Sequence, residues 1–239
     1  MPRRSVFGVL LVALLSFSTL VSTHAAWTEV TSTGGPKRWL SITSSSDGTK
    51  LAAVVREENI WTSADSGATW TEVTSTGGTK YWIDITSSSD GTKLAAVVWT
   101  GNIWTSADSG ATWTEVTSIG STKLWTEITS SSDGTKLAAP VSGQYWPDWS
   151  GGIWTSTDSG ATWTEVTSTG GTQGWQGITS SSDGTKLAAV DYNDPHGGNI
   201  WTFAAPLPPP PPLRPCTCCE RSMKSMGFTV GAEDCDPEL

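Results

Sequence analysis

Two carboxylates occupy the same position in neighbouring copies of a repeated segment. Asp84 and Glu127 each stand directly before a strand-like Ile-Thr-Ser segment, where the other copies carry Ser41 and Gly177. Facing carboxyl groups on adjacent strands could act as general acid and general base in glycoside hydrolysis. Single acids at strand ends are more often solvated surface groups, so the catalytic interpretation and the surface interpretation both stay open.

Aromatic and charged side chains gather in the segments where the copies differ. Trp99, Trp146 and Trp149 stand outside the positions at which the other tryptophans recur. Exposed rings beside carboxylates suit sugars, whose C–H faces stack on rings while their hydroxyls form hydrogen bonds. We predict a ligand-binding surface for a glycan or an extracellular protein, although loops that merely cap the fold are the alternative. Its candidate residues are Arg38, Arg56, Tyr81, Trp99, Tyr145, Trp146, Asp148, Trp149, Tyr192, Asp194 and His196.

Four near-copies of one unit must position these side chains. Each copy contains the residues ITSSSDGTKLAA, at 42–53, 85–96, 128–139 and 178–189. Self-similarity at a period of about 40 to 45 residues, with several short strands in each unit, is typical of a β-propeller. Each unit is then one blade, which cannot bury its faces alone.

The four strand-like runs of each unit, separated by Gly, Ser and Asp turns, correspond to one blade. In the second unit these runs are 82–86, 93–98, 102–106 and 112–116. The repeats begin with a lone fourth strand at 27–30, and the last unit stops after a third strand at 199–203. We therefore predict an all-β fold, a β-propeller of four blades of four antiparallel strands, closed by the N-terminal strand pairing in the last blade. A dimer that completes a larger ring, or a sequence that has lost copies, is the alternative.

The variable connections are expected to share one face of this ring. The hairpins between strands one and two and between strands three and four are nearly identical in all units, whereas the other connections differ. Antiparallel order places the connections from strand two to three and from strand four to one together. Because loops on a rigid scaffold carry function, that face is the candidate binding surface.

One eight-residue segment recurs three times between the third and fourth strands. It reads Ser-x-Asp-Ser-Gly-Ala-Thr-Trp at 63–70, 106–113 and 156–163. This segment resembles the Asp-box, or BNR repeat, of sialidases, xyloglucan-cleaving glycosidases, sortilin-type receptors and the photosystem II assembly-factor propeller. The resemblance covers residues 27–205 and implies a propeller, but it implies no single activity because those families share only a fold element.

Turn chemistry and the resemblance together assign a structural role to the segment. The aspartate can accept backbone N–H bonds across the turn, the glycine takes a left-handed conformation, and the tryptophan packs beneath the blade. In the similar families the segment lies on the rim away from the ligand, which implies that its aspartates are neither catalytic nor calcium-binding. The residues concerned are Ser63, Asp65, Gly67, Trp70, Ser106, Asp108, Gly110, Trp113, Ser156, Asp158, Gly160 and Trp163.

The segments outside the repeats predict export. Residues 1–26 combine two arginines, an apolar stretch and small residues, which is typical of a secretory signal peptide. The stretch is shorter than the roughly 20 residues that span a bilayer, so we expect a secreted protein without a membrane span in its mature form. Residues 206–215 predict a stiff polyproline II linker.

The tail at 216–239 holds all four cysteines of the chain. In an exported protein these predict two disulfides of open connectivity, or one disulfide plus thiols that link to another molecule. Their spacing does not fit a zinc site, and we expect no metal or cofactor. The residues are Cys216, Cys218, Cys219 and Cys235.

Charge and motifs narrow the classes of function. The formal net charge of −9 disfavours binding to nucleic acid. Sialidases hold the substrate carboxylate with three arginines, and the repeats contain only Arg38 and Arg56, which disfavours that activity. The leading hypothesis is a secreted, non-catalytic binding propeller. The alternatives are a glycoside hydrolase that uses Asp84 and Glu127, and a scaffold similar to the photosystem II assembly factor.

Overall fold

The computed structural model describes residues 26–143, 151–169, 173–192 and 197–204. In these ranges the regular structure is β-strand, apart from one 3-10 turn at Thr167–Thr169 (η1). The same ranges contain no helix that is long and apolar enough to cross a membrane. The predicted signal peptide, polyproline linker and cysteine tail lie outside the described residues.

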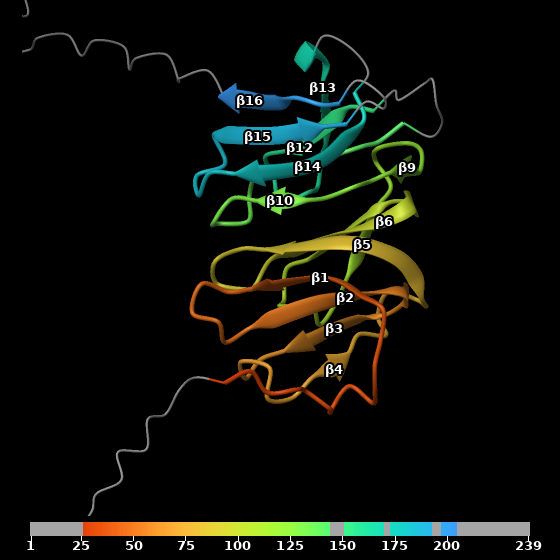
Figure 1. Cartoon of the computed structure of the whole chain (residues 1–239), viewed down its shortest axis with the longest axis vertical. Coiled ribbons are helices and arrows are strands. Elements are labelled where there is room, and N and C mark those ends of the chain that lie inside the picture. Colours follow the sequence, from red (N-terminus) through yellow and green to blue (C-terminus); the bar gives the residue numbers. More distant parts are fainter. Residues whose placement is uncertain (1–25, 144–150, 170–172, 193–196, 205–239) are drawn as a thin grey trace, which may run out of the picture.

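The strands form four antiparallel groups that follow one another along the chain (Figure 1). The first blade contains β1 (Trp39–Ser44), β2 (Leu51–Glu58), β3 (Ile60–Ser63) and β4 (Thr71–Glu72). The second contains β5 (Lys80–Ser87), β6 (Leu94–Gly101), β7 (Ile103–Ser106) and β8 (Thr114–Val116). The third contains β10 (Thr129–Ser130), β11 (Leu137–Pro140), β12 (Ile153–Ser156) and β13 (Thr164–Val166), preceded by β9 (Lys123–Leu124). The fourth contains β14 (Trp175–Ser180), β15 (Lys186–Asp191) and β16 (Ile200–Ala204).

Every blade uses the same register between its second and third strands. An alanine of the repeated Leu-Ala-Ala run stands opposite the tryptophan of the third strand, in the pairs Ala53↔Trp61, Ala96↔Trp104, Ala139↔Trp154 and Ala189↔Trp201. Identical sequence therefore gives identical pairing, because side chains alternate between the two faces with a period of two residues. The strands predicted for the second unit agree with β5 to β8 within a few residues.

The core lies between the blades and is built on tryptophan. Trp82 is fully buried, and its ring lies 6.2 Å from that of Trp104 and 6.4 Å from that of Trp113. Its indole N–H donates at 3.1 Å to the carbonyl oxygen of Glu58 in the preceding blade. Trp125 repeats this contact with Gly101. Small alanines on the second strands leave room for these large rings. The first-strand tryptophan therefore both fills the space between two blades and donates a hydrogen bond to the preceding blade.

The three repeated Ser-x-Asp-Ser-Gly-Ala-Thr-Trp segments form equivalent hairpins. In the second, Asp108 accepts from the Thr112 N–H at 2.8 Å, and the Ser106 hydroxyl accepts from the Gly110 N–H at 2.9 Å. Gly110 has a φ of +88°, a conformation that glycine adopts without steric cost. The indole of Trp113 donates to the Gly110 carbonyl oxygen. The side chains of the segment thus complete the hydrogen bonds of its own turn.

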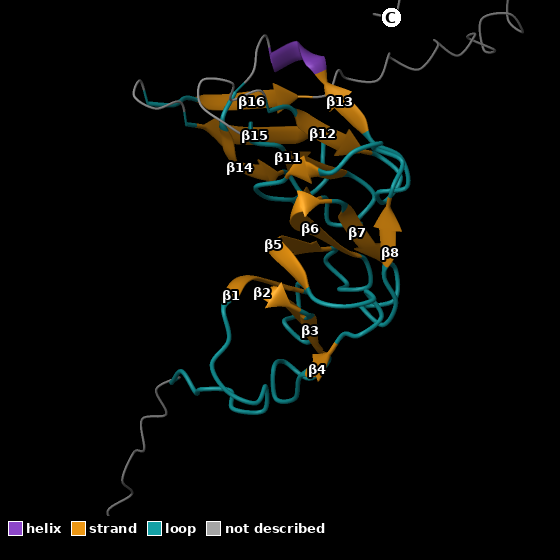
Figure 2. Cartoon of the chain, turned by 90° about the vertical axis from the view of Figure 1, so that its right-hand side faces the viewer, coloured by secondary structure: helices purple, strands orange, loops and turns teal. Residues whose placement is uncertain are grey.

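The predicted closure of a four-bladed ring is not present in this structure. Residues 26–30 form no strand, the Trp27 side chain is 105% exposed, and the fourth blade has three strands. The blades form an open arc in which β4 and β16 lie at opposite ends (Figures 1 and 2). The blades turn through only part of a circle in this structure, and among the described residues no strand pair joins 27–30 to 199–203.

Candidate ligand-binding rim

The variable connections of neighbouring blades pair with each other along one rim of the arc. Arg56 of β2 stands opposite Tyr81 of β5, and Trp99 of β6 stands opposite Leu124 of β9. An isolated bridge between Gly151 and Gln173 continues the same relationship toward the fourth blade. The turn after each second strand is therefore held against the entry into the next blade, which fixes the loops that differ most in sequence.

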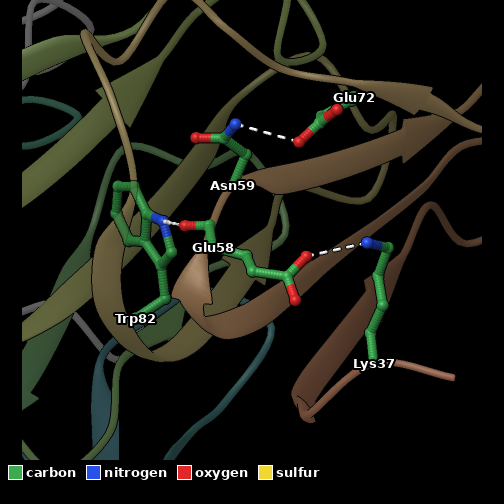
Figure 3. A network of polar contacts seen from close by, with 5 residues as sticks. All are labelled: Lys37, Glu58, Asn59, Glu72 and Trp82. Atoms are coloured by element: carbon green, nitrogen blue, oxygen red, sulfur yellow. Dashed lines mark hydrogen bonds and ion pairs between the residues drawn. The ribbon is translucent and has the colours of Figure 1, made fainter.

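The first of these turns is anchored by its neighbours (Figure 3). The Lys37 ammonium donates to the Glu58 carboxylate at 2.7 Å, and the Asn59 amide donates to Glu72 at 2.9 Å. The Trp82 indole binds the Glu58 carbonyl oxygen from the next blade. Because Glu57 at the tip has a φ of +62°, these anchors on both sides hold a conformation that is uncommon for a residue with a side chain.

Three of the predicted side chains form a continuous stacked row at this rim. The Arg56 guanidinium carbon lies 4.3 Å from the centre of the Tyr81 ring. The Tyr81 ring lies 6.2 Å from the Trp99 ring, at an interplanar angle of 35°. Trp99 is 38% exposed, whereas most tryptophans of the blades are buried or half-buried. We call Arg56, Tyr81 and Trp99 the rim row. It offers ring faces and a cation to a ligand from two adjacent blades.

Charged groups border the first end of the rim row. The Glu57 carboxylate lies 3.5 Å from Arg56 Nε and 3.9 Å from Arg38 Nη1. Arg56 Nε is buried and has no hydrogen-bond acceptor among the described residues, because its contact with Glu57 lacks hydrogen-bond geometry. Exposed ion pairs of this kind contribute about 0 to 1 kcal/mol, so Glu57 can exchange its arginine contacts for a ligand at little cost.

The lysines that precede the first-strand tryptophans have a packing role. The ammonium groups lie over the rings of the third-strand tryptophans: Lys37 is 5.2 Å from Trp61, Lys80 is 4.6 Å from Trp104, and Lys123 is 4.7 Å from Trp154. Such contacts contribute about 0.5 to 1 kcal/mol each at exposed sites. In three of the four units a lysine stands two residues before the first-strand tryptophan, and this regular spacing was the sequence signal for the packing role; the fourth unit has Gln173 there.

Other predicted binding residues lie apart from the rim row or outside the described residues. Tyr192, which is 50% exposed, follows β15 at the place that Trp99 takes after the core of β6, so it belongs to the same rim in the fourth blade. Its N–H donates to the Gly174 carbonyl oxygen at 2.9 Å. The candidates outside the described residues are Tyr145, Trp146, Asp148, Trp149, Asp194 and His196.

Asp84 lies in β5 and Glu127 lies between β9 and β10, and each binds the backbone of the next blade. Asp84 Oδ2 accepts from the Ile128 N–H at 2.9 Å, and Glu127 Oε2 accepts a short hydrogen bond from the Ile178 N–H. Burial raises the pKa of the Asp84 carboxyl, against the opposing effect of a hydrogen bond from Ser41. Burial also raises the pKa of the Glu127 carboxyl, and the negative charge of Asp84 adds to the increase. The charges of the two acids therefore interact, and each carboxylate is already bound to a backbone N–H of the next blade.

The described part of the chain contains no cluster of side chains placed as metal ligands. No group of three or more His, Cys, Asp or Glu side chains is placed there to hold a metal ion. The aspartates of the repeated hairpins instead accept hydrogen bonds from their own turns, with Thr69, Thr112 and Thr162 as donors.

Comparisons with known proteins place the fold. Neither protein-family models nor curated protein sequences gave a match. A GH74 xyloglucanase from Xanthomonas campestris matches with a TM-score of 0.53 at 17% identity, over 71% of this chain and 28% of that chain. A putative TolB from Agrobacterium tumefaciens matches with a TM-score of 0.54 at 18% identity, over 71% of this chain and 59% of that chain. YCF48 from Cyanidioschyzon merolae matches with a TM-score of 0.52 at 15% identity, over 70% of this chain and 51% of that chain.

These similarities and the all-β architecture show that the chain has a β-propeller fold. At identities of 15 to 18% they show the fold alone. The chain spans 28 to 59% of the length of the three proteins, so its arc corresponds to a part of each.

Proposed function

We propose that the chain is a secreted, non-catalytic binding propeller that recognises a glycan through the rim row, with the repeated hairpins serving as structural Asp-boxes. The observation that carries the proposal is the stacked contact of Arg56, Tyr81 and Trp99 across two blades. A protein ligand that presents a similar surface is the alternative partner.

The chemistry of the rim row favours a sugar. A pyranose presents C–H groups on its faces and hydroxyls on its edge, so it can stack on Trp99 while its hydroxyls bond to charged groups. Glu57 supplies an acceptor beside the rings, and the Arg56 guanidinium supplies a positive charge. Because the anchored turns fix these groups before binding, little conformational entropy is lost when the ligand is bound.

A screen of the purified protein against soluble polysaccharides, read by titration calorimetry, tests this proposal. We expect Trp99→Ala and Tyr81→Ala each to weaken binding at least tenfold. Trp99→Phe and Tyr81→Phe are the matched controls, because they retain a ring for stacking, and both should stay within about threefold of the wild type. Thermal unfolding of each variant checks that the fold is intact. Unchanged binding by both alanine variants would remove the rim row from the site.

A second candidate function is glycoside hydrolysis by Asp84 and Glu127. It is favoured by the raised pKa of these two carboxyls at equivalent positions of adjacent blades, since a general acid must stay protonated near the working pH. Xyloglucan is the first substrate to test, because one similar structure is a xyloglucanase. Release of reducing sugar that is lost in Asp84→Asn and in Glu127→Gln supports this function. Full activity in both variants, or no release by the wild type, rejects it.

A further inference from the structure

The fourth blade exposes residues whose copies in the other blades are buried. Ile200 of β16 is 78% exposed, whereas its copies are at most 8% exposed: Ile60, Ile103 and Ile153. Val190 of β15 is 42% exposed, although the valines at its position in β2 and β6 are fully buried. We call Val190 and Ile200, which stand opposite each other in β15 and β16, the C-end face. In the other blades a fourth strand and a following blade cover these positions.

The first blade also exposes residues whose copies in the other blades are buried. Ile42 of β1 is 63% exposed, whereas its copies are at most 6% exposed: Ile85, Ile128 and Ile178. Trp39 is 39% exposed, and its copies are fully buried: Trp82, Trp125 and Trp175. We call Trp39 and Ile42 the N-end face. In later blades the preceding blade covers these positions. The N-end face belongs to the first blade and the C-end face to the fourth, and no strand pair joins these two blades among the described residues (Figure 1).

A backbone ladder between blades also stops at these two faces. The N–H of Ser46 donates to the carbonyl oxygen of Ser89, that of Ser89 to Ser132, and that of Ser132 to Ser182, each at 2.7 Å. The Ser182 N–H at one end and the Ser46 carbonyl oxygen at the other have no backbone partner among the described residues. They are the donor and the acceptor that one more step of the same ladder requires.

Lysine side chains also bind the backbone of the next blade. Lys93 Nζ donates to the Asp133 carbonyl oxygen at 3.0 Å, and Lys136 Nζ donates to that of Asp183 at 2.7 Å, each in the next blade. The lysine stems pack on the turn glycines at Gly91, Gly134 and Gly184, whereas the space around Gly48 in the first blade is open. Among the described residues, no blade follows Lys186 of the fourth blade and none precedes Asp47 of the first. Opposite charges are thus left at the two ends.

The fourth blade also lacks the tryptophan that completes the others. Trp82 packs against both Trp104 and Trp113, whereas Trp175 packs against Trp201, at 5.8 Å. A cleft of about 90 Å³ lies beside this pair, lined by residues that include Val166, Leu187 and Phe203. The exposed segment 27–30 has the sequence Trp-Thr-Glu-Val, which begins with the same tryptophan as the fourth strands of the other blades.

We propose that two copies of this chain close a ring, in which the N-end face of each copy packs on the C-end face of the other and residues 27–30 add a fourth strand to the partner's last blade. Both ends expose apolar surface. The fourth blade also offers the backbone donor and a positive charge, and the first blade offers the backbone acceptor and a negative charge. A heterologous contact of this kind closes when two copies complete the rotation, and hides both exposed sheet edges. The register of the other blades sets the new pairing, with Glu29 opposite Trp201 as Glu72 stands opposite Trp61.

Sedimentation equilibrium of the full chain under reducing conditions tests the ring, because reductant prevents disulfides of the tail from producing a dimer. We expect twice the mass of one chain. Ile42→Arg and Ile200→Arg should each give the mass of one chain, since every junction then contains one altered face. Ala111→Arg, an exposed substitution on the second blade, is the control and should leave the mass at two chains.

A mixture of the two arginine variants identifies which faces meet. One junction of a mixed pair combines an intact N-end face with an intact C-end face, so mixing Ile42→Arg with Ile200→Arg should restore a two-chain species. A wild-type chain that sediments as a monomer at micromolar concentration would overturn the proposal. So would a series of masses above two chains, which indicates an open polymer, or a dimer that only one of the two variants disrupts.

Discussion

The carboxylate of Asp84 accepts a hydrogen bond at 2.9 Å from the backbone N–H of Ile128, across the boundary between the second and third blades. Glu127 makes the equivalent bond to Ile178 across the next boundary. In the first blade Ser41 stands at this position and bonds to Asp84. Side chains at this position therefore link neighbouring blades where no strand pairing joins them among the described residues. Because the residue at this position differs between the units, the charge of the link differs from one boundary to the next.

Replacing Asp84 with asparagine should stabilise the protein at pH 7. Burial raises the folded-state pKa of Asp84 above its unfolded value, so the stability contribution is fully present below about pH 4 and is lost as pH rises through the folded pKa. Asp84→Asn removes the charge and keeps an oxygen that can accept from the Ile128 N–H. We expect its melting temperature at pH 7 to exceed that of the wild type by a few degrees, since about 1 kcal/mol corresponds to roughly 2 to 4 °C at this size.

The matched control for this prediction is Asp84→Leu. It also removes the charge, but it leaves the Ile128 N–H without an acceptor, which costs about 1 to 3 kcal/mol. Calorimetric scans at pH 4 and pH 7 should show the advantage of Asp84→Asn shrinking at the lower pH. Equal destabilisation by asparagine and leucine at pH 7 would contradict the role of the hydrogen bond.

Two glycines of similar conformation should respond differently to alanine. Gly110 and Gly120 have φ values of +88° and +89°, so alanine at either site costs about 1 to 2 kcal/mol in backbone conformation. A Cβ on Gly110 would lie 2.8 Å from the Thr62 methyl carbon of the preceding blade, whereas a Cβ on Gly120 meets no atom within 4 Å. We expect Gly110→Ala to be the more destabilising by about 1 to 3 kcal/mol in urea unfolding, the usual cost of overpacking. Equal losses would show that the hairpin can move away from Thr62.

The sequence predicted the blades because the interactions that form them are local. The turn of Asp108 closes on Thr112 four residues away, and the hairpin of β5 and β6 closes around an Asp-Gly turn. Patterns of this kind repeat with the residues that make them, so strand order, register and hairpin roles could be derived from one unit. The packing of recurrent tryptophans between blades followed from the same repetition.

The ring and the rim row depend on relationships between blades, which a repeat does not encode. Closure within one chain requires a certain rotation at each boundary, and that rotation is set by how rings such as Trp82 pack against the neighbouring blade. The stacking of Arg56 on Tyr81 requires the register of β2 against β5, two strands that belong to different units. For the same reason the sequence showed Asp84 and Glu127 as equivalent acids without showing the amides that they bind.

The repeated hairpins should lose part of their stability in acid. The hydroxyl and N–H of Thr162 and the Ser156 hydroxyl lower the pKa of Asp158 from 3.8 to about 2. Because the folded pKa lies below the unfolded value, the contribution is present above about pH 4 and is lost as pH falls toward 2. We expect the melting temperature of the wild type to fall over this window and that of Asp158→Asn to fall less. Thr162→Val, which removes one hydroxyl donor, should move the Asp158 titration measured by NMR toward its ordinary pKa; an unchanged titration would contradict the assigned cause.

The contact between Arg56 and Tyr81 should appear as a coupling energy. With the guanidinium 4.3 Å from the ring, a cation–π interaction of about 0.5 to 1 kcal/mol is expected at this half-exposed site. A double-mutant cycle of Arg56→Ala and Tyr81→Ala in urea unfolding measures it, and a second cycle with Arg38→Ala and Tyr81→Ala is the control, because Arg38 contacts Glu57 instead. We expect coupling in the first cycle and none in the second. Equal values in both cycles would mean that the rim row is not held in place by stacking, and that its rings are ordered by the turn at Glu57 alone.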